Sequence, residues 1–195
     1  MADSYRNDPA VQQLIIVQAA HSGEAQLLLY EKSESNGSSV WTEALRCDAL
    51  IGVNGLGKTK EGDGKTPVGD FGILTAFGIK PDPGTALPYL QVDENTYCCG
   101  DEAYYNQIID AKVLHHDCTG EHLIDYCPEY NYAIFLDYNK EGIPGKGSAI
   151  FLHCKGAKPY TGGCVAVSEE NMVTILRSLQ YGARILIHDD PAKTE

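Results

Sequence analysis

The chain has 195 residues, of which 43% are hydrophobic, so it is long enough to bury one sizeable core. Its net charge of −12 argues against nucleic acid and anionic membrane surfaces as partners, because both select for basic patches. No stretch approaches the roughly 18 apolar residues of a membrane span. The polar start, Met1 to Arg6, has no signal-peptide pattern, which leaves open a cytoplasmic protein or an exported one whose signal is missing.

The first half of the chain has the pattern of short strands. Residues 1–10 are expected to form an unpacked lead-in to a single domain over residues 11–190, because no composition shift or long linker divides that range. The aliphatic runs 14–20 and 25–31 flank a turn-like stretch, 21–24, and predict a β-hairpin.

Further turns and strands follow. A second turn is expected over 33–39 with a strand beginning at Val40, and strand structure resumes over 69–74. Residues 80–107, with three prolines, predict a long irregular excursion, and loops of that length are often functional lids.

The last third predicts two strands, one helix and a final strand. A hairpin of residues 132–138 and 148–152 would place His153 at the rim of the sheet. Ser168 is a good N-cap for a helix that ends by Gly182, and its apolar residues recur at helical spacing: Met172, Ile175, Leu176 and Leu179. A strand over 183–188 closes the chain. The pattern predicts a mainly β (α+β) fold, a sandwich or barrel-like mixed sheet with a few helices.

Residues 52–59 satisfy the pattern of a phosphate-binding loop, G-x-x-x-x-G-K-[ST]. A nucleotide site also requires a helix directly after this pattern. The residues that follow, 61–67, contain two glycines and a proline and cannot form one. The sequence therefore does not predict nucleotide binding.

A rival site is suggested by histidines and cysteines between residues 115 and 127, because these residue types are the preferred ligands of zinc. The set comprises His115, His116, Cys118, His122 and Cys127. Its spacing matches no standard zinc motif, so no metal is predicted, and a zinc-binding module stays as an alternative.

The seven cysteines comprise Cys164 and six others: Cys47, Cys98, Cys99, Cys118, Cys127 and Cys154. An odd count leaves at least one free thiol, which suits a nucleophile. The other six could form up to three disulfides in an oxidising compartment, but a domain of this size does not need them, and free thiols are favoured.

Cys164 and His153 form the strongest candidate for a catalytic pair. A thiol is mostly protonated at neutral pH and needs a base, which His153 could supply. Backbone N–H groups of Gly162, Gly163 and Cys164 could form an oxyanion hole, since glycine lets the backbone approach closely. The structural alternative is a buried cysteine and a histidine that merely ends a strand.

Two blocks of sequence strengthen the interpretation of Cys164 and His153 as a catalytic pair. The run GSAIFLH is followed by TGGCVAVS, and an earlier block reads NGLGK and then EGDGKTPVGDFGI. The chain in these blocks, which run from residue 54 to residue 168, resembles the L,D-transpeptidase catalytic domain (YkuD-like) family. That family has a histidine followed by [ST]-x-G-C, and one branch has an EGDGxTPxGxF segment. Many members carry His or Ala where Gly162 stands, so any role of a histidine there is absent.

The resemblance implies peptidoglycan L,D-transpeptidation with Cys164 as nucleophile and His153 as proton acceptor and donor. It implies a backbone carbonyl as the partner of His153, stem peptides as substrate, carbapenem-type β-lactams as covalent inhibitors and no cofactor. It would place the enzyme in the bacterial cell envelope, outside the cytoplasmic membrane. An L,D-carboxypeptidase and a non-catalytic wall-binding domain are the alternatives.

Four further residues are candidates for substrate binding: Tyr105, Asn106, Ser148 and Thr161. Tyr105 and Asn106, with Tyr104 before them, could line a peptide-binding cleft, and family members show a similar Tyr-Asn after an acidic stretch. A loop held in place by buried aromatic rings would explain the same residues.

Overall fold

The computed structural model describes residues 5, 8–21, 23–35 and 38–189. Its strands, in chain order, are β1 Gln13–His21, β2 Glu24–Ser35, β3 Ser38–Leu50, β4 Gly69–Phe71, β5 Ile73–Gly78, β6 Tyr89–Gln91, β7 Thr96–Cys98, β8 Ile108–Asp110, β9 Glu121–His122, β10 Ala133–Leu136, β11 Phe151–Cys154, β12 Val165–Val167 and β13 Arg184–Asp189. Its α-helices are α1 Ala111–Leu114 and α2 Glu169–Ser178, and the described 3-10 helices are η2 Glu102–Tyr104, η3 Leu123–Asp125 and η4 Glu129–Asn131.

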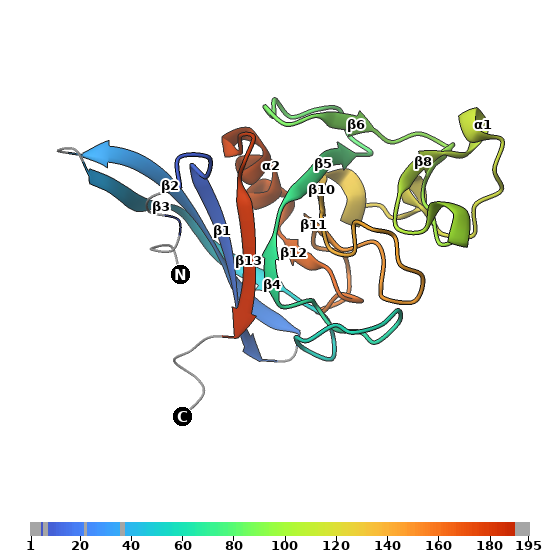
Figure 1. The fold of residues 1–195 in the computed structure, drawn as a ribbon, viewed down its shortest axis with the longest axis horizontal. Helices are drawn as coiled ribbons and strands as arrows, with labels where there is room; N and C mark the ends of the chain where they lie inside the picture. Colours follow the sequence, from blue (N-terminus) through green and yellow to red (C-terminus); the bar gives the residue numbers. More distant parts are fainter. Residues whose placement is uncertain (1–4, 6–7, 22, 36–37, 190–195) are drawn as a thin grey trace.

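The ten-stranded sheet has the order β4-β13-β1-β2-β3-β12-β11-β10-β5-β6 (Figure 1). The pairs β1–β13, β11–β12 and β5–β6 are parallel and the other pairs are antiparallel. Only Gly72 separates β4, at one edge, from β5, next to the other edge, so the sheet must bend round on itself. The prediction of a mainly β fold with a barrel-like mixed sheet is confirmed.

Both predicted hairpins are present. β1 pairs antiparallel with β2, and β10 pairs antiparallel with β11. The turn expected over 33–39 is shorter, because cross-strand pairing of β2 with β3 continues to Ser35 and Ser38. Residues 1–4 and 6–7 of the expected lead-in, and residues 22 and 36–37 of the expected turns, lie outside the described residues.

Strands β10, β11 and β12 are buried on both faces, and the two faces belong to different apolar clusters. One face packs against α2 and contributes Ile134, Leu136, Leu152, Val165 and Val167 to the main core. The other face contributes Ala133, Phe135, Phe151 and Cys164 to a second cluster, together with Phe77 of β5 and Tyr130 of η4. Side chains alternate between the faces of a strand, which explains why neighbouring residues here enter different clusters.

Helix α2 begins as predicted and ends earlier than predicted. The Ser168 side chain accepts the Asn171 N–H at 3.2 Å as an N-cap. The helix stops at Ser178 because the Gln13 side chain, on β1, donates to the Ser178 carbonyl at 2.6 Å and accepts the Gln180 N–H at 2.7 Å. These bonds satisfy backbone groups that another helical turn would otherwise have paired.

The excursion over 80–107 is more regular than expected. It contains β6 and β7, and β7 pairs with β8 and β9 in a separate three-stranded sheet. Figure 1 shows this small sheet at the opposite end of the molecule from the β2–β3 hairpin. Strands of three residues are set by such tertiary pairing, which the local sequence does not encode.

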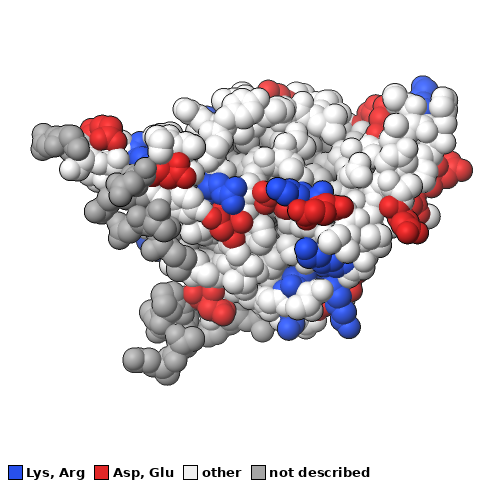
Figure 2. Space-filling view, viewed as in Figure 1, with Lys and Arg blue, Asp and Glu red and all other residues white. Residues whose placement is uncertain are grey.

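The surface carries charges of both signs. Figure 2 shows acidic and basic side chains interspersed over the face viewed there, so the net negative charge is not gathered into one patch on it. Among the described residues, no helix has the length and apolar character that crossing a membrane requires.

Candidate active site

Strands β11 and β12 place His153 and Cys164 on one face of the sheet. His153 lies inside β11 and not beyond its end, since the strand covers Phe151–Cys154 and not the predicted residues 148–152. Ala149 has a φ of +53° and interrupts the extended backbone before it. In the parallel pair, His153 is opposite Ala166, two residues after Cys164, so the side chains of His153 and Cys164 share a face. The Phe151 N–H donates to Cys164 Sγ at 3.3 Å.

A backbone carbonyl fixes the tautomer of His153. Nδ1 lies 2.7 Å from the Cys154 carbonyl oxygen, which can only accept a hydrogen bond, so Nδ1 carries the proton and Nε2 has a free lone pair. Burial lowers the pKa of His153 below its ordinary value, although this hydrogen bond and the charge of Glu129 oppose the shift. The imidazole is therefore neutral at pH 7 and can accept a proton.

The Cys164 thiol is held in its protonated form. It donates to the Ala149 carbonyl at 3.1 Å and is 8% exposed. Burial, and then the negative charge of Glu121, raise the pKa of Cys164 to about 12, against the opposing effects of the Phe151 N–H and Lys58. In this state the nucleophile needs a base at the moment of attack.

Two threonines fix the backbone of Cys164. The hydroxyls of Thr161 and Thr66 donate to the Cys164 carbonyl at 2.7 and 3.2 Å. The Gly163 N–H donates to Thr161 Oγ1 at 3.1 Å and so is already occupied, which removes it from the expected oxyanion donors in this state. Within the described ranges, the N–H groups of Gly162 and Cys164 have no acceptor and stay available.

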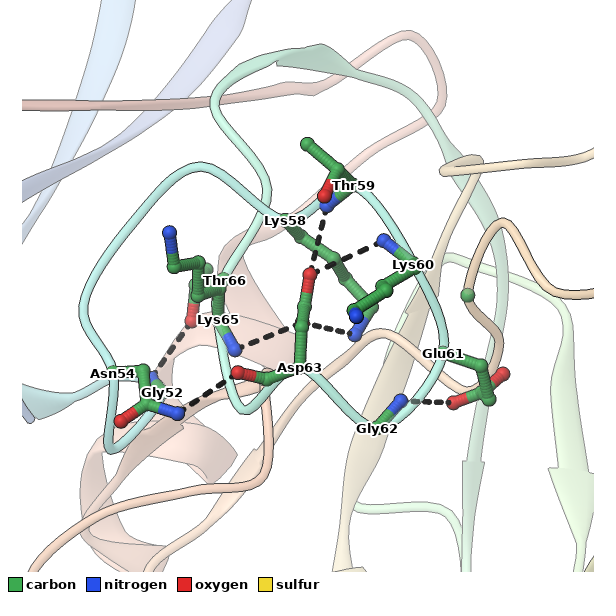
Figure 3. Close-up of polar contacts among 12 residues, drawn as sticks. Gly52, Asn54, Lys58, Thr59, Lys60, Glu61, Gly62, Asp63, Lys65 and Thr66 are labelled. Atoms are coloured by element: carbon green, nitrogen blue, oxygen red, sulfur yellow. Dashed lines mark hydrogen bonds and ion pairs between the residues drawn. The ribbon is translucent and has the colours of Figure 1, made fainter.

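Residues 57–66, which include Gly57, Gly62 and Gly64, form a tight loop around Asp63 (Figure 3). The Asp63 carboxylate accepts the N–H groups of Thr59, Lys65 and Lys60 and pairs with Lys58 Nζ at 3.0 Å. Burial opposes ionisation of Asp63, but these donors outweigh it and hold its pKa well below the ordinary range.

This loop explains the exclusion of a nucleotide site. The Lys58 side chain is only 2% exposed and is committed to Asp63, so it cannot meet a phosphate. The loop instead supports the nucleophile, because the Gly52 N–H donates to Thr66 Oγ1, the same hydroxyl that donates to the Cys164 carbonyl.

Two pockets flank the pair. One, of ≈ 300 Å³, is lined among others by Glu61, Cys98, Glu121, Tyr126, Ser148 and Ala149. The other, of ≈ 130 Å³, is lined among others by Tyr126, Glu129, Tyr130, His153, Tyr160 and Thr161. Tyr126 lines both pockets, and its ring stacks on that of Tyr130 at 5.0 Å. Tyr126 therefore separates a pocket lined by His153 from one lined by Ala149, the residue whose carbonyl accepts the Cys164 thiol.

Two of the predicted substrate residues meet at a carboxylate that the sequence did not single out. The hydroxyls of Tyr105 and Ser148 both donate to Glu61, the latter at 2.7 Å. Glu61 and Glu121 share the larger pocket, which is consequently acidic. Its place as the first residue of the EGDG block was the one sequence feature that could have marked Glu61 as part of the site. Asn106 is buried and holds the backbone, and Thr161 holds the nucleophile segment.

The rival zinc set is not brought together as the sequence suggested. His122 binds the Asp125 carboxylate at 2.9 Å and the Glu94 carbonyl at 3.0 Å, and Cys127 donates to Asn131. His115 is an exposed residue in left-handed conformation at the end of α1. His122 and Cys127 are thus bound to other groups, and His115 faces solvent. All seven cysteines are free.

Comparison with known proteins gives a family match and similar solved structures, including the two that follow. The family model for the L,D-transpeptidase catalytic domain (YkuD) matches residues 15–187. The helical cell shape determining protein Pgp2 from Campylobacter jejuni is 14% identical, with 96% of this chain and 54% of that chain covered and a TM-score of 0.48. The Ldtfm-avibactam carbamoyl enzyme is 13% identical, with 93% and 49% covered and a TM-score of 0.41. The chain spans about half the length of these structures. No curated protein matches it significantly.

Proposed function

The chain belongs to the YkuD family of L,D-transpeptidase catalytic domains, and on that premise we propose that it is a cysteine acyltransferase acting on peptidoglycan stem peptides. Cys164 is the nucleophile and His153 the general base and acid. The observation that carries the proposal is the fixed tautomer of His153, whose Nδ1–H is bound to the Cys154 carbonyl, on the sheet face that also carries the Cys164 thiol.

The first half-reaction makes a thioester. As Cys164 Sγ attacks the carbonyl carbon of an L-residue linked to a D-residue, its proton passes to Nε2 of His153. The N–H groups of Cys164 and Gly162 stabilise the negative oxygen of the tetrahedral intermediate. The C–N bond then breaks, and His153 returns the proton to the amine of the departing D-amino acid.

The second half-reaction releases the acyl group. An amine or a water molecule attacks the thioester carbonyl and gives a proton to His153, and the carbon–sulfur bond breaks as Cys164 regains its proton. An amine makes this a transpeptidation, and water makes it an L,D-carboxypeptidase reaction. The pocket beside His153 offers either acceptor, amine or water, a place next to the base.

The acidic pocket supports a substrate with an ammonium group. Glu61 and Glu121 face the same ≈ 300 Å³ space, which also includes Ala149, the residue whose carbonyl binds the Cys164 thiol. A cation in this space would be attracted to both carboxylates, and it would also ease the repulsion that Glu121 exerts on a Cys164 thiolate. Stem peptides carrying a diamino acid provide such a group. An enzyme with this substrate works outside the bacterial cytoplasmic membrane, in the cell envelope.

Intact-protein mass after incubation with a carbapenem tests the nucleophile. We expect one covalent adduct on the wild type and none on Cys164→Ala, with Cys47→Ala as a matched control that keeps the adduct. Absence of an adduct from the wild type, followed by no turnover of a stem tetrapeptide, would favour a non-catalytic wall-binding domain. Turnover without an adduct would keep the proposed function and exclude only the inhibitor.

The identity of the product then distinguishes transpeptidase from carboxypeptidase activity. Incubation of the stem tetrapeptide with and without an added amine acceptor, followed by mass spectrometry, distinguishes a cross-linked product from a tripeptide. A tripeptide as the sole product at saturating acceptor would assign the carboxypeptidase.

A further inference from the structure

A cluster of metal-binding side chains lies in the small three-stranded sheet, apart from the catalytic pair. Cys99 and Asp101 follow β7, and His116 follows α1. Cys99 Sγ is 3.7 Å from His116 Nε2 and 3.5 Å from Asp101 Oδ2, and those last two atoms are 3.1 Å apart. We propose that these three residues, with Cys118, bind a structural zinc ion.

The three separations fit a single tetrahedral ion. Zinc lies about 2.3 Å from sulfur and about 2.0–2.2 Å from nitrogen or oxygen, so tetrahedral angles place ligand atoms roughly 3.3–3.7 Å apart. The observed distances of 3.7, 3.5 and 3.1 Å between the ligand atoms are close to these separations. The three ligand atoms also lie within 4.8 Å of one another as a group.

Cys118, two residues after His116, would supply the fourth ligand once its side chain turns toward the ion, because its sulfur lies outside the group of atoms within 4.8 Å of one another. In the present conformation that sulfur accepts the Gly120 N–H at 3.3 Å. Two thiolates, an imidazole and a carboxylate form a donor set that suits zinc, a borderline-soft ion. Asp101 is oriented from behind by the N–H and hydroxyl of Thr119, at 3.0 and 2.5 Å, as carboxylate ligands of metals commonly are.

Close backbone packing brings together the two segments that carry the ligands, residues 99–101 and residues 116–120. Gly120 lies so close to the other segment that a Cβ on it would be 1.9 Å from the Cys98 carbonyl oxygen and 2.5 Å from the Gly100 nitrogen. The pairing of Cys98 with Glu121 continues this contact into β7 and β9. The cluster is therefore part of a defined fold and not a chance meeting of loops.

Helix α1, between the two ligand segments, has little apolar packing to hold it. It has no buried residue, and Val113 and Leu114 are 71% and 41% exposed. An ion linking the segments would add to their stability. Because Cys98 and Glu121 also line the larger pocket, the ion would hold one wall of the candidate active site in place. The zinc proposal itself does not depend on the proposed function.

Hydrogen bonding offers a competing explanation. Asp101 Oδ2 accepts from Cys99, His116 and the Thr119 N–H, so the cluster is satisfied without a metal if the thiol and imidazole are protonated. A disulfide between Cys99 and Cys118 is a second competitor. The hydrogen-bonded cluster predicts no stoichiometric zinc in the reduced protein, whereas the disulfide predicts no zinc only before reduction.

Zinc content measured on the full chain decides among these. After purification in reducing buffer with added Zn²⁺ and gel filtration, we expect about one zinc per chain by elemental mass spectrometry. Cys99→Ser and His116→Gln should lose most of it. His115→Gln and Cys127→Ser are matched controls, since both residues are exposed and outside the cluster, and they should keep it.

Cobalt provides a readout that needs no substitution. Zinc-free wild type titrated with Co²⁺ should develop the visible bands and sulfur charge-transfer absorption of a tetrahedral thiolate site, and Zn²⁺ should abolish them. Absence of stoichiometric zinc and of these bands in the reduced wild type would overturn the proposal. Equal zinc in the His116→Gln and His115→Gln variants, both with wild-type circular dichroism, would overturn it as well.

Discussion

The Asn106 carboxamide oxygen accepts the backbone N–H of Ala149 at 2.9 Å, and the carbonyl of Ala149 in turn accepts the Cys164 thiol. Asn106 has a φ of +60° and its amide donates to the carbonyls of Tyr138 and Asn139. A residue first proposed for substrate binding therefore fixes the loop that positions the nucleophile. Ala149, with its φ of +53°, depends on that support.

Asn106→Ala is expected to destabilise the protein and slow acylation of Cys164. The substitution leaves buried backbone groups without partners, at about 1–3 kcal/mol each, so a total near 3 kcal/mol is reasonable. Urea unfolding and the acylation rate measure the two effects. Asn54→Ala, which removes one bond from an exposed residue, should cost under about 1 kcal/mol. Equal losses in the two variants would contradict the role given to Asn106.

Adjacent glycines before the nucleophile should differ in their tolerance of alanine. Gly163 has a φ of +149°, and a Cβ on it would lie 2.8 Å from the Lys65 carbonyl oxygen, whereas a Cβ on Gly162 meets nothing within 4 Å. We expect Gly163→Ala to cost about 1–3 kcal/mol and to impair acylation. Gly162→Ala should stay within about 0.5 kcal/mol of wild type. Thermal unfolding of the pair checks this, and a destabilised Gly162→Ala would show that the open space is not real.

The sequence was most informative where a residue pattern is read locally. Aliphatic runs placed β1 and β2, helical apolar spacing placed α2, and two short motifs made Cys164 and His153 candidates for a catalytic pair. It was least informative where distant segments pair. β6, β7 and β9 are short strands created by their neighbours, and the Cys154 carbonyl that binds His153 has no sequence signature at all.

The sequence also did not show which polar side chains bind one another. Ser148 and Tyr105 looked like independent contacts for a substrate, yet both bind Glu61. His116 belonged to a suspected group with His122, yet its neighbours in space are Cys99 and Asp101, from a different segment. Which polar group meets which depends on loop geometry, and that geometry follows from tertiary contacts.

The buried Lys58–Asp63 pair should contribute strongly to stability. Asp63→Ala would leave the Lys58 ammonium buried without its partner, which typically costs about 3–5 kcal/mol. Urea unfolding at pH 7 measures the loss. Asp70→Asn is the control, because the Arg184–Asp70 pair is 30% and 40% exposed and should contribute under about 1 kcal/mol. A loss of that smaller size for Asp63→Ala would show that the pair is not buried in solution.

The same pair predicts a pH dependence of stability. The pKa of Asp63 is lower in the folded protein than its ordinary value of about 3.9. Its contribution is therefore complete above that ordinary value and is lost as the pH falls from there through the lower, folded pKa. The free-energy difference between wild type and Asp63→Ala should shrink only below about pH 4. A difference that already shrinks near pH 6 would point to a group other than Asp63.

The rate of Cys164 acylation should report the lowered pKa of His153. The base must be neutral to accept the thiol proton, and burial keeps the imidazole neutral below its ordinary pKa of about 6.5. The rate should therefore hold at its neutral-pH value as the pH falls past 6.5 and decline only at the lower, folded pKa. Mass-spectrometric rates of carbapenem acylation from about pH 4.5 to about 9.5 test this, with free carbapenem hydrolysis subtracted at each pH. His153→Asn should lose the acidic decline along with most of the rate. A wild-type midpoint at or above 6.5 would show that the imidazole is solvated during the reaction, or that another group is the base.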